Sequence, residues 1–505
     1  MISKILSGTV YGIEGFIIDV EIDISSGLPS FSIVGLPDTA VRESRERVTS
    51  AIRNSGFDFP MKKIVVNLAP ADLKKEGAGF DLPIAIGILA ATGVIKNVNL
   101  ADFCFIGELA LDGSVRPVKG VLSVSLKLSK KNKFFVIPDH NVKEAAVTKT
   151  KVFGIKNLAE VVKFLNGEMN MHPYEEDLEK VYEENCVYEV DFSDVKGQQY
   201  VKRAVEVAAS GGHNILMIGP PGSGKTMIAA RVPTILPKLS YEEAIETTRI
   251  YSVAGILQQG FISFRPFRAP HHTISDVALV GGGQTPKPGE ISLAHNGVLF
   301  LDELPEFDRN VIEVLRQPLE SGTITVSRAT FKCDFPANIM LIAACNPCPC
   351  GYYGHPKKEC VCTPYQIQKY ISKISGPLLD RIDIHIEVPP VEIEELSSDI
   401  TSESSQTIRQ RVEKVRKVQY ERYKNKRIYT NSQLTSKTIK EFCPMTEQAK
   451  SILKTSIEKL SLSARAYDRI IKVARTIADM DDKEVIDVVH IAEAVQYRSI
   501  DRWMK

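Results

Sequence analysis

The chain lacks several features that mark other classes of protein. Its formal net charge is +1 over 505 residues, so any binding of nucleic acid has to come from local basic patches and not from the overall charge. It contains no apolar run of membrane-spanning length, and its first residues, Met1-Ile2-Ser3-Lys4, do not form a signal-peptide pattern. We therefore expect a cytoplasmic protein that does not interact with a membrane.

Cysteine is scarce and odd in number. Nine cysteines in a chain of this length, with no export signal, do not favour a disulfide framework, and they direct attention to thiol or metal chemistry. No internal repeat is evident. The length predicts two to four domains, and a composition that is 44% hydrophobic and 25% charged is typical of globular proteins.

The clearest motif is a complete G-x-x-x-x-G-K-[ST] phosphate-binding loop. It consists of Gly219, Pro220, Pro221, Gly222, Ser223, Gly224, Lys225 and Thr226. An apolar run at 214–218 predicts a buried strand before the loop, and residues 227–231 predict the start of a helix after it. Glycines allow backbone N–H groups to point at a triphosphate, Lys225 reaches the outer phosphates, and the Thr226 hydroxyl can ligate Mg²⁺.

A second part of the same site follows about eighty residues downstream. The apolar run 297–301 predicts a strand buried on both faces, and it ends in Asp302 and Glu303. Ligands of parallel sheets bind at the carboxyl ends of strands. Asp302 is therefore expected to hold Mg²⁺ through water, and Glu303 to orient and polarise the attacking water.

The pattern along the chain predicts a multidomain α/β protein. Residues 1–168 predict a compact α+β domain, with a half-exposed strand at 20–24 and a helix that starts after Asp38 and ends near Gly56. An acidic linker follows at 169–187. Alternating strands and helices over 188–390 predict a parallel-sheet core that carries the nucleotide motifs, and 391–505 predicts a helical domain.

Four cysteines form a C-x-C, nine residues, C-x-C arrangement: Cys348, Cys350, Cys360 and Cys362. Four thiolates on a short hairpin can enclose a tetrahedral structural Zn²⁺; the alternative is four buried or free thiols. His355 could compete as a ligand.

His271 and His272 are adjacent in the sequence and are expected in an extended segment, where adjacent side chains point opposite ways and cannot easily share a metal. The role of the pair is open.

Beyond these motifs, the chain resembles the magnesium-chelatase-like AAA+ ATPases of the YifB/ComM group over nearly its whole length. The likeness includes residues 265–273 (RPFRAPHHT), 289–297 (GEISLAHNG) and 375–383 (SGPLLDRID). It implies an AAA+ parallel-sheet core, a C-terminal helical lid and a Lon-protease-like N-terminal domain. It also implies ATP as the nucleotide and a homo-hexameric ring, with no small-molecule substrate other than ATP.

The resemblance assigns further roles residue by residue. Asn346 resembles the polar sensor near the γ-phosphate, Arg381 an arginine finger donated to a neighbouring subunit, and Arg465 the second sensor on the lid. In the Lon-like part, Gly79 and Leu122 stand where the serine and lysine of the catalytic dyad would be. Without a hydroxyl nucleophile and an amine base, peptidase activity is not expected, and the domain is interpreted as a binding or assembly module.

Two stretches are candidates for DNA contact. Residues 322–332 predict a β-hairpin with Arg328 near its tip and Lys332 beside it, and in the related MCM helicase motors such a hairpin carries a basic residue into the ring pore. A solvated hairpin tip is the alternative. The basic stretch 409–427 could face phosphates, although a solvated helix face is the more common outcome for such a pattern.

Together these observations predict a Mg²⁺-dependent ATPase that translocates on single-stranded or branched DNA. The resemblance implies a branch-migration helicase of recombination and natural transformation. An ATP-dependent protein remodeller or chelatase-type chaperone motor is the alternative.

Overall fold

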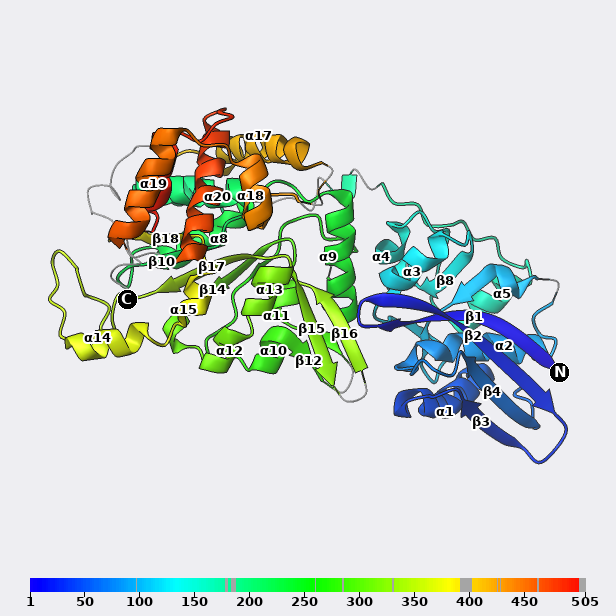
Figure 1. Cartoon of the computed structure of the whole chain (residues 1–505). Helices are drawn as coiled ribbons and strands as arrows, with labels where there is room; N and C mark the ends of the chain where they lie inside the picture. The colour runs from blue at the N-terminus through cyan, green and yellow to red at the C-terminus, as the bar shows by residue number, and fades with distance from the viewer. Residues whose placement is uncertain are drawn as a thin grey trace. The chain divides into compact units, whose positions relative to one another are not determined.

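The computed structural model of the chain describes residues 1–96, 98–177, 180–182, 188–258, 260–283, 286–328, 331–390, 402–424, 426, 428–460 and 463–498. The chain forms two compact units (Figure 1). The first comprises Met1–Asn185 and Tyr241–Ser263, and the second comprises Cys186–Ser240 and Phe264–Lys505. No helix in the described ranges is both long enough and apolar enough to cross a membrane.

A seven-stranded mixed sheet forms the centre of the first unit, in the order β3-β4-β2-β1-β5-β8-β9. Its strands are β1 (Ile2–Tyr11), β2 (Glu14–Ser25), β3 (Ser30–Val34), β4 (Lys63–Ala69), β5 (Phe103–Phe105), β8 (Phe134–Pro138) and β9 (Val152–Ile155). Burial alternates along β2, which confirms the half-exposed strand predicted at 20–24. The inward-facing residues of β2 contribute to the hydrophobic core of this unit.

Helices cover this sheet, and their ends follow local capping rules. They are α1 (Thr39–Asn54), α2 (Asp81–Ala91), α3 (Val121–Ser129), α4 (Val142–Ala146) and α5 (Leu158–Leu165). The Asp38 carboxylate accepts a hydrogen bond from the Val41 N–H at 2.8 Å, so the predicted N-cap of α1 is confirmed. Gly56 lies just beyond the end of α1 with φ 85°, a conformation that favours glycine.

Helix α9 (Tyr241–Ala254) packs with the first unit, although the sequence places it inside the segment 188–390 that was expected to form the core. The Arg249 guanidinium donates to the Ile13 carbonyl and to the Glu14 carboxylate, both at 2.8 Å. The Ser252 hydroxyl donates to the buried carboxylate of Glu144, whose pKa is raised by burial. The first unit is therefore built from two segments of the sequence.

The second unit contains a five-stranded parallel sheet in the order β11-β14-β17-β10-β18, as the sequence predicted. Its strands are β11 (Phe267–Arg268), β14 (Val298–Leu301), β17 (Met340–Cys345), β10 (Ile215–Ile218) and β18 (Ile384–Glu387). Every residue of β10, β14 and β17 is buried, because helices cover both faces of such a sheet. The pairs β12 (Gly281–Gly282) with β13 (Lys287–Pro288) and β15 (Thr323–Arg328) with β16 (Phe331–Pro336) form separate antiparallel ribbons.

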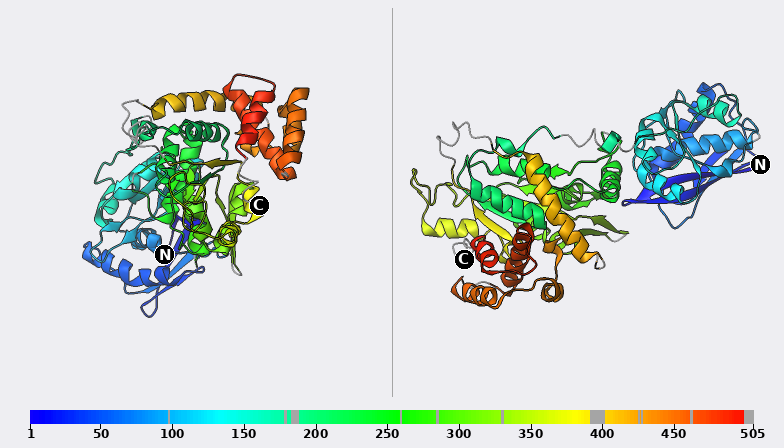
Figure 2. Two further views of the ribbon diagram at one scale, coloured as in Figure 1. Left: turned by 90° about the vertical axis from the view of Figure 1, so that its left-hand side faces the viewer. Right: turned by 90° about the horizontal axis from the view of Figure 1, so that it is seen from above.

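The helices of the second unit fall into two groups: those around the parallel sheet, called the core helices, and those of the C-terminal helical region from residue 402 onward, called the lid helices. The core helices are α7 (Gln199–Gly211), α8 (Lys225–Ile235), α10 (Asp276–Val280), α11 (Glu290–Leu293), α12 (Arg309–Glu313), α13 (Arg316–Ser321), α14 (Pro364–Ile371) and α15 (Gly376–Leu379). The lid helices are α17 (Ser405–Tyr423), α18 (Ser436–Phe442), α19 (Glu447–Leu460), α20 (Ala464–Met480) and α21 (Val488–Gln496). Helix α17 packs against α7 and α8 (Figure 2), so core and lid share one hydrophobic core.

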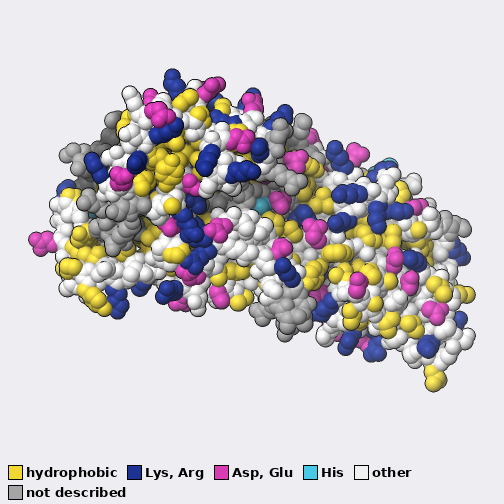
Figure 3. All heavy atoms as spheres, viewed as in Figure 1, with side chains coloured by type: hydrophobic (Ala, Val, Ile, Leu, Met, Phe, Trp, Pro, Cys, Tyr) yellow, Lys and Arg dark blue, Asp and Glu magenta, His cyan; other side chains and the backbone are white. Residues whose placement is uncertain are grey.

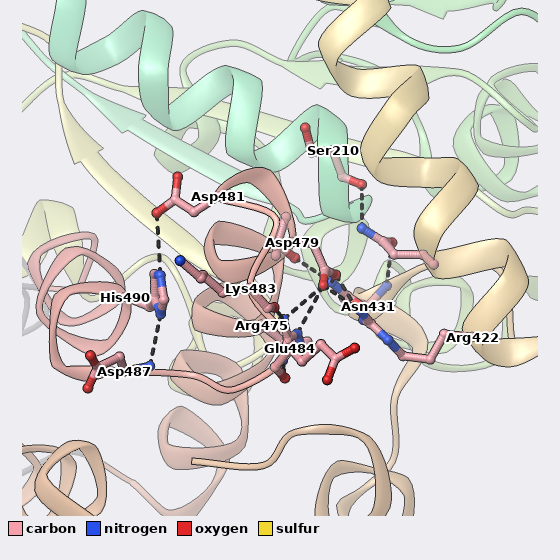
Figure 4. A network of polar contacts seen from close by, with 12 residues as sticks. Ser210, Arg422, Asn431, Arg475, Asp479, Asp481, Lys483, Glu484, Asp487 and His490 are labelled. Atoms are coloured by element: carbon pink, nitrogen blue, oxygen red, sulfur yellow. Dashed lines mark hydrogen bonds and ion pairs between the residues drawn. The ribbon is translucent and has the colours of Figure 1, made fainter. Parts of the chain in front are cut away.

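A buried polar network joins the lid helices (Figure 4). The Asp479 carboxylate accepts hydrogen bonds from Arg422 at 2.5 and 2.9 Å, from Arg475 at 3.1 Å and from Asn431 at 2.9 Å. A buried carboxylate with this many donors is fully satisfied, so it fixes α17 relative to α20 without the cost of an unpaired charge.

Candidate nucleotide-binding site

The phosphate-binding loop connects β10 to α8, as predicted. Gly222 and Gly224 have φ values of 78° and 86°, and a side chain at either position would meet nothing within 4 Å. Glycine is therefore required there by the backbone conformation and not by crowding. Gly219 is different, because a Cβ atom on it would lie 2.2 Å from the carbonyl oxygen of Val388. The loop thus begins where the backbones of β10 and β18 approach closely.

Lys225 is buried at the start of α8, and its ammonium group is held by the loop itself. Its Nζ donates to the carbonyl oxygens of Gly219 at 2.7 Å and Pro220 at 2.9 Å, and it lies 3.4 Å from Oδ1 of Asn346. Burial lowers the pKa of Lys225, and nearby Asp302 acts in the opposite direction. The structure therefore brings Asn346, the residue expected to act as polar sensor, next to Lys225.

The acid pair follows β14 at the carboxyl edge of the sheet. The Thr226 hydroxyl donates to Asp302 Oδ2 at 2.7 Å, so the two oxygen ligands expected for Mg²⁺ lie together. Glu303 adopts a left-handed backbone conformation with φ 52°, and its N–H donates to Asp302 Oδ1 at 2.9 Å. A non-glycine residue held in this conformation is typical of functional sites.

The structure corrects the expectation that His271 and His272 point in opposite directions. Residues 271–274 form a turn, closed by a hydrogen bond from the Ile274 N–H to the His271 carbonyl at 3.0 Å. The two ring centroids consequently lie only 4.1 Å apart. His272 Nδ1 lies 3.5 Å from Glu303 Oε2, whereas His271 Nδ1 contacts the Thr273 hydroxyl at 2.9 Å. His272 is thus adjacent to the carboxylate expected to activate water.

The two arginines that the resemblance singled out have different surroundings: Arg381 follows Asp380 in the sequence, and Arg465 lies near the Asp380 carboxylate. Arg381 is only 8% exposed; its guanidinium pairs with Glu320 and donates to the Pro377 carbonyl at 2.6 Å. Arg465 is exposed, and its Nη1 lies 4.0 Å from Asp380 Oδ2. For Arg381 to reach a nucleotide on another subunit, its ion pair with Glu320 would have to open.

The four cysteines of the C-x-C pairs converge as the sequence predicted. Their sulfur atoms all lie within 4.8 Å of one another, with Cys348 buried and the other three half-buried. Such a set of thiols could hold a metal ion. His355 does not belong to the set, because its Nδ1 accepts hydrogen bonds from the N–H groups of Lys357 and Lys358.

The predicted hairpin at 322–332 is formed by β15 and β16, with Ser327 opposite Lys332. Lys332 is exposed, and the side chain of Arg328 lies outside the part of the chain that the structure describes.

In the basic stretch 409–427, most described basic side chains bond to the protein itself. These contacts are Arg409 to the Thr234 carbonyl, Arg411 to Glu206 and Glu403, Lys414 to Asp482, Arg416 to the Ala209 carbonyl, Arg422 to Asp479 and Lys426 to Glu441. The helix serves mainly to attach the lid.

In the first unit, the two positions at which the resemblance would place a Lon dyad hold no nucleophile and no amine. A Cβ atom on Gly79 would lie 3.2 Å from the Ile106 side chain. Leu122 is fully buried, and its N–H donates to the Glu144 carboxylate at 2.9 Å.

Two further residues support the nucleotide loop and were not expected from the sequence. The Gln198 side chain donates to the carbonyl oxygens of Ser223 and Pro389, both at 2.9 Å. Tyr370 is buried near the Asn346 backbone; burial raises the pKa of Tyr370, and the Asn346 backbone acts in the opposite direction. Gln198 and Tyr370 lie outside the motifs, and neither belongs to a sequence pattern that could have revealed these contacts.

Comparison with known proteins agrees with this geometry. Residues 191–396 match the family model "Magnesium chelatase, subunit ChlI", residues 20–141 match "Subunit ChlI of Mg-chelatase", and residues 402–498 match "Magnesium chelatase, subunit ChlI C-terminal".

Several relatives match at nearly full length. The chain is 45% identical to competence protein ComM of Haemophilus influenzae, over 98% of this chain and 97% of that protein. It is also 45% identical to the uncharacterized protein YifB of Escherichia coli, over 97% of this chain and 96% of that protein. An MCM-type protein of Methanocaldococcus jannaschii is 26% identical over 31% of this chain and 20% of its own length. The chain therefore belongs to the magnesium-chelatase-like YifB/ComM family.

Proposed function

We propose that this chain is a Mg²⁺-dependent AAA+ ATPase that assembles as a hexameric ring and moves along DNA, acting as a branch-migration helicase in recombination and natural transformation. The observation that carries the ATPase part is the convergence of Lys225, Thr226, Asp302 and Asn346 at one edge of the parallel sheet. Bound Mg²⁺ would neutralise charge on the phosphates, held by Thr226 and Asp302. Glu303 would then orient the attacking water.

The DNA part of the proposal depends on relatives and on one hairpin. A relative at 45% identity is named competence protein ComM, and an MCM-type protein matches part of the chain. Figure 3 shows Lys and Arg side chains interspersed with Asp and Glu on the viewed face, consistent with a net charge of +1. DNA contact therefore has to be local, and we assign it to Arg328 and Lys332 of the β15–β16 hairpin.

A ring is proposed because Arg381 would act on the nucleotide of a neighbouring copy, with Arg465 as a second sensor on the lid. In this proposal residues 1–168 form a Lon-like domain that lacks the Ser/Lys dyad and serves binding or assembly. Residues 169–187 link it to the core at 188–390 and the lid at 391–505, with 241–263 packing on the first unit. We further propose Zn²⁺ as a structural ion of the four cysteines.

The test is ATPase stimulation by single-stranded, duplex and four-way-junction DNA, with casein as a protein control. The proposal predicts that DNA raises the rate, most with branched or single-stranded DNA, and that a variant with Arg328→Ala and Lys332→Ala loses this response while keeping its basal rate. Stimulation by casein alone would contradict it. That outcome would favour a protein remodeller or chelatase-type motor, which the family match over 191–396 makes the second candidate.

A further inference from the structure

The cysteine cluster lies next to the nucleotide site, and its sulfur geometry suits one metal ion. The Sγ–Sγ separations are 3.3 Å for Cys348–Cys350, 3.7 Å for Cys348–Cys360 and 3.6 Å for Cys350–Cys360. Four sulfurs around a tetrahedral Zn²⁺ with Zn–S bonds of about 2.3 Å are separated by roughly 3.8 Å. The shortest separation is far longer than the roughly 2.05 Å of a disulfide. The Tyr353 N–H donates to Cys348 Sγ at 3.3 Å, so a backbone hydrogen bond also holds this sulfur.

One side of the cluster packs directly on the phosphate-binding loop. Gly351 follows Cys350, and its N–H donates to the Cys348 carbonyl at 2.9 Å, so it belongs to the turn that the first two cysteines form. A Cβ atom on Gly351 would lie 2.6 Å from Cδ and 2.8 Å from Cγ of Pro221. Only a residue without a side chain allows this turn to touch the loop so closely.

The other side of the cluster leads back to the sensor. Cys348 is two residues from Asn346, whose side chain contacts Lys225. Cys362 is followed at once by Thr363, which caps α14 in a reciprocal arrangement with Gln366. Helix α14 carries the buried Tyr370, which lies close enough to the Asn346 backbone for that backbone to influence the Tyr370 pKa. Both ends of the cysteine segment thus converge on Asn346.

We propose that Zn²⁺ bound by Cys348, Cys350, Cys360 and Cys362 braces the phosphate-binding loop and Asn346, so that nucleotide affinity depends on the metal. The brace rests on the proposed ATPase function, because it acts on the same site. Loss of the ion would release the Cys348–Gly351 turn from Pro221 and free the segment that positions Asn346. Nucleotide binding would then have to order this segment, and the loss of conformational entropy would weaken the affinity for nucleotide.

The first experiment uses the full-length chain as purified. Zinc content is measured by mass spectrometry, and affinity is measured with a fluorescent ATP analogue. The double variant Cys360→Ser with Cys362→Ser is expected to lose zinc and to bind the analogue at least about 10-fold more weakly, which corresponds to about 1.4 kcal/mol. Cys443→Ala, which changes a buried cysteine of the lid, should keep both zinc and affinity.

A second pair of variants tests the contact itself and does not require removal of the metal. Gly351 and Gly354 lie in the same loop with φ values of 83° and 75°, but a Cβ atom on Gly354 would meet nothing within 4 Å. Alanine should impose similar backbone strain at both positions, while only Gly351→Ala would push against Pro221. We expect Gly351→Ala to retain zinc and to bind nucleotide at least about 10-fold more weakly than Gly354→Ala.

The outcomes separate the brace from the function on which it rests. Absence of zinc from the unmodified protein would overturn the metal assignment. Equal affinities in the two alanine variants, or unchanged affinity after zinc is lost, would overturn the brace. If the cysteine variant does not fold, as judged by circular dichroism, the comparison of Gly351→Ala with Gly354→Ala tests the brace instead. A zinc-containing protein that binds no nucleotide would instead refute the proposed ATPase, and the brace with it.

Discussion

The two units of this chain both pair a sheet with helices, yet they differ in what lies at the place where chemistry is expected. In the second unit, Lys225, Asp302 and Asn346 come from three segments and meet at one sheet edge. In the first unit, the positions at which a resemblance to Lon proteases would place the dyad are Gly79 and the buried Leu122. The difference teaches that a fold supplies positions, whereas activity requires reactive groups at those positions.

The strongest test of this contrast is Glu303→Gln in the second unit. Removing a group that orients and polarises water should lower kcat by about 10²- to 10⁴-fold while nucleotide still binds. Steady-state ATPase assays together with nucleotide binding would measure this split. Glu306→Gln is the matched control, because Glu306 lies three residues away and pairs with Lys373 at 3.2 Å. Equal losses in both variants would argue against a specific role for Glu303.

Each unit contains a fully buried aspartate that forms an ion pair with an arginine, and the contributions of the two pairs to stability can be compared. Asp81 accepts from Arg47 at 2.6 Å in the first unit, and Asp383 accepts from Arg469 at 2.8 Å in the second; both carboxylates are fully buried. Replacing either aspartate by asparagine should cost about 3–5 kcal/mol, because the largely buried guanidinium of Arg47 or Arg469 loses its carboxylate partner. Chemical denaturation of Asp81→Asn and Asp383→Asn would measure it.

The Asp383 pair also predicts a dependence on pH. Burial alone would raise the pKa of Asp383, but Arg469 and the His213 ring hold it well below its usual range. A carboxyl group whose pKa is lower in the folded state stabilises the fold above its unfolded pKa of about 3.9. This contribution is lost as the pH falls further. The stability of the unmodified protein should therefore fall more steeply below about pH 4 than that of Asp383→Asn.

The next variant, Lys225→Ala, tests nucleotide binding, whereas Glu303→Gln tests hydrolysis. Each charge-assisted hydrogen bond to the phosphates is worth about 1.5–3 kcal/mol, so we expect a loss of at least about 10- to 100-fold in ATP affinity. Titration calorimetry would measure the change. Lys238→Ala, which alters an exposed lysine just beyond α8, should bind ATP normally. Normal binding by Lys225→Ala would place the nucleotide elsewhere.

The smallest expected effect concerns Glu320, which pairs with Arg381. The side chain of Glu320 is 56% exposed whereas that of Arg381 is 10% exposed, so solvent screens one partner of the pair and its contribution should be about 1 kcal/mol. Glu320→Gln should therefore change the free energy of unfolding by about 1 kcal/mol or less, while leaving Arg381 free to contact a neighbouring copy. Thermal unfolding and ATPase rate can be compared directly. A loss of activity as large as that of Arg381→Ala would show that the pair is required for turnover.

The elements that the sequence predicts correctly are those with strong local signals. The phosphate-binding loop, the buried strands on either side of it and the cap at Asp38 each depend on a few neighbouring residues. Contacts between segments that lie far apart in the sequence were not predictable in this way. Residues 241–254 fall in the segment 188–390 that was expected to form the core, but α9 packs on the first unit through contacts of Arg249 and Ser252. The turn at His271 likewise overrides the extended segment that was expected.

The most direct test of the central claim is to mix two inactive variants, Lys225→Ala and Arg381→Ala. If one copy supplies the nucleotide site and its neighbour the arginine, a mixed ring contains some sites with both groups intact. We predict that mixing restores a measurable part of the ATPase activity, whereas each variant alone has almost none. Absence of recovery in rings shown to contain both variants, or full activity of a strictly monomeric protein, would contradict the account.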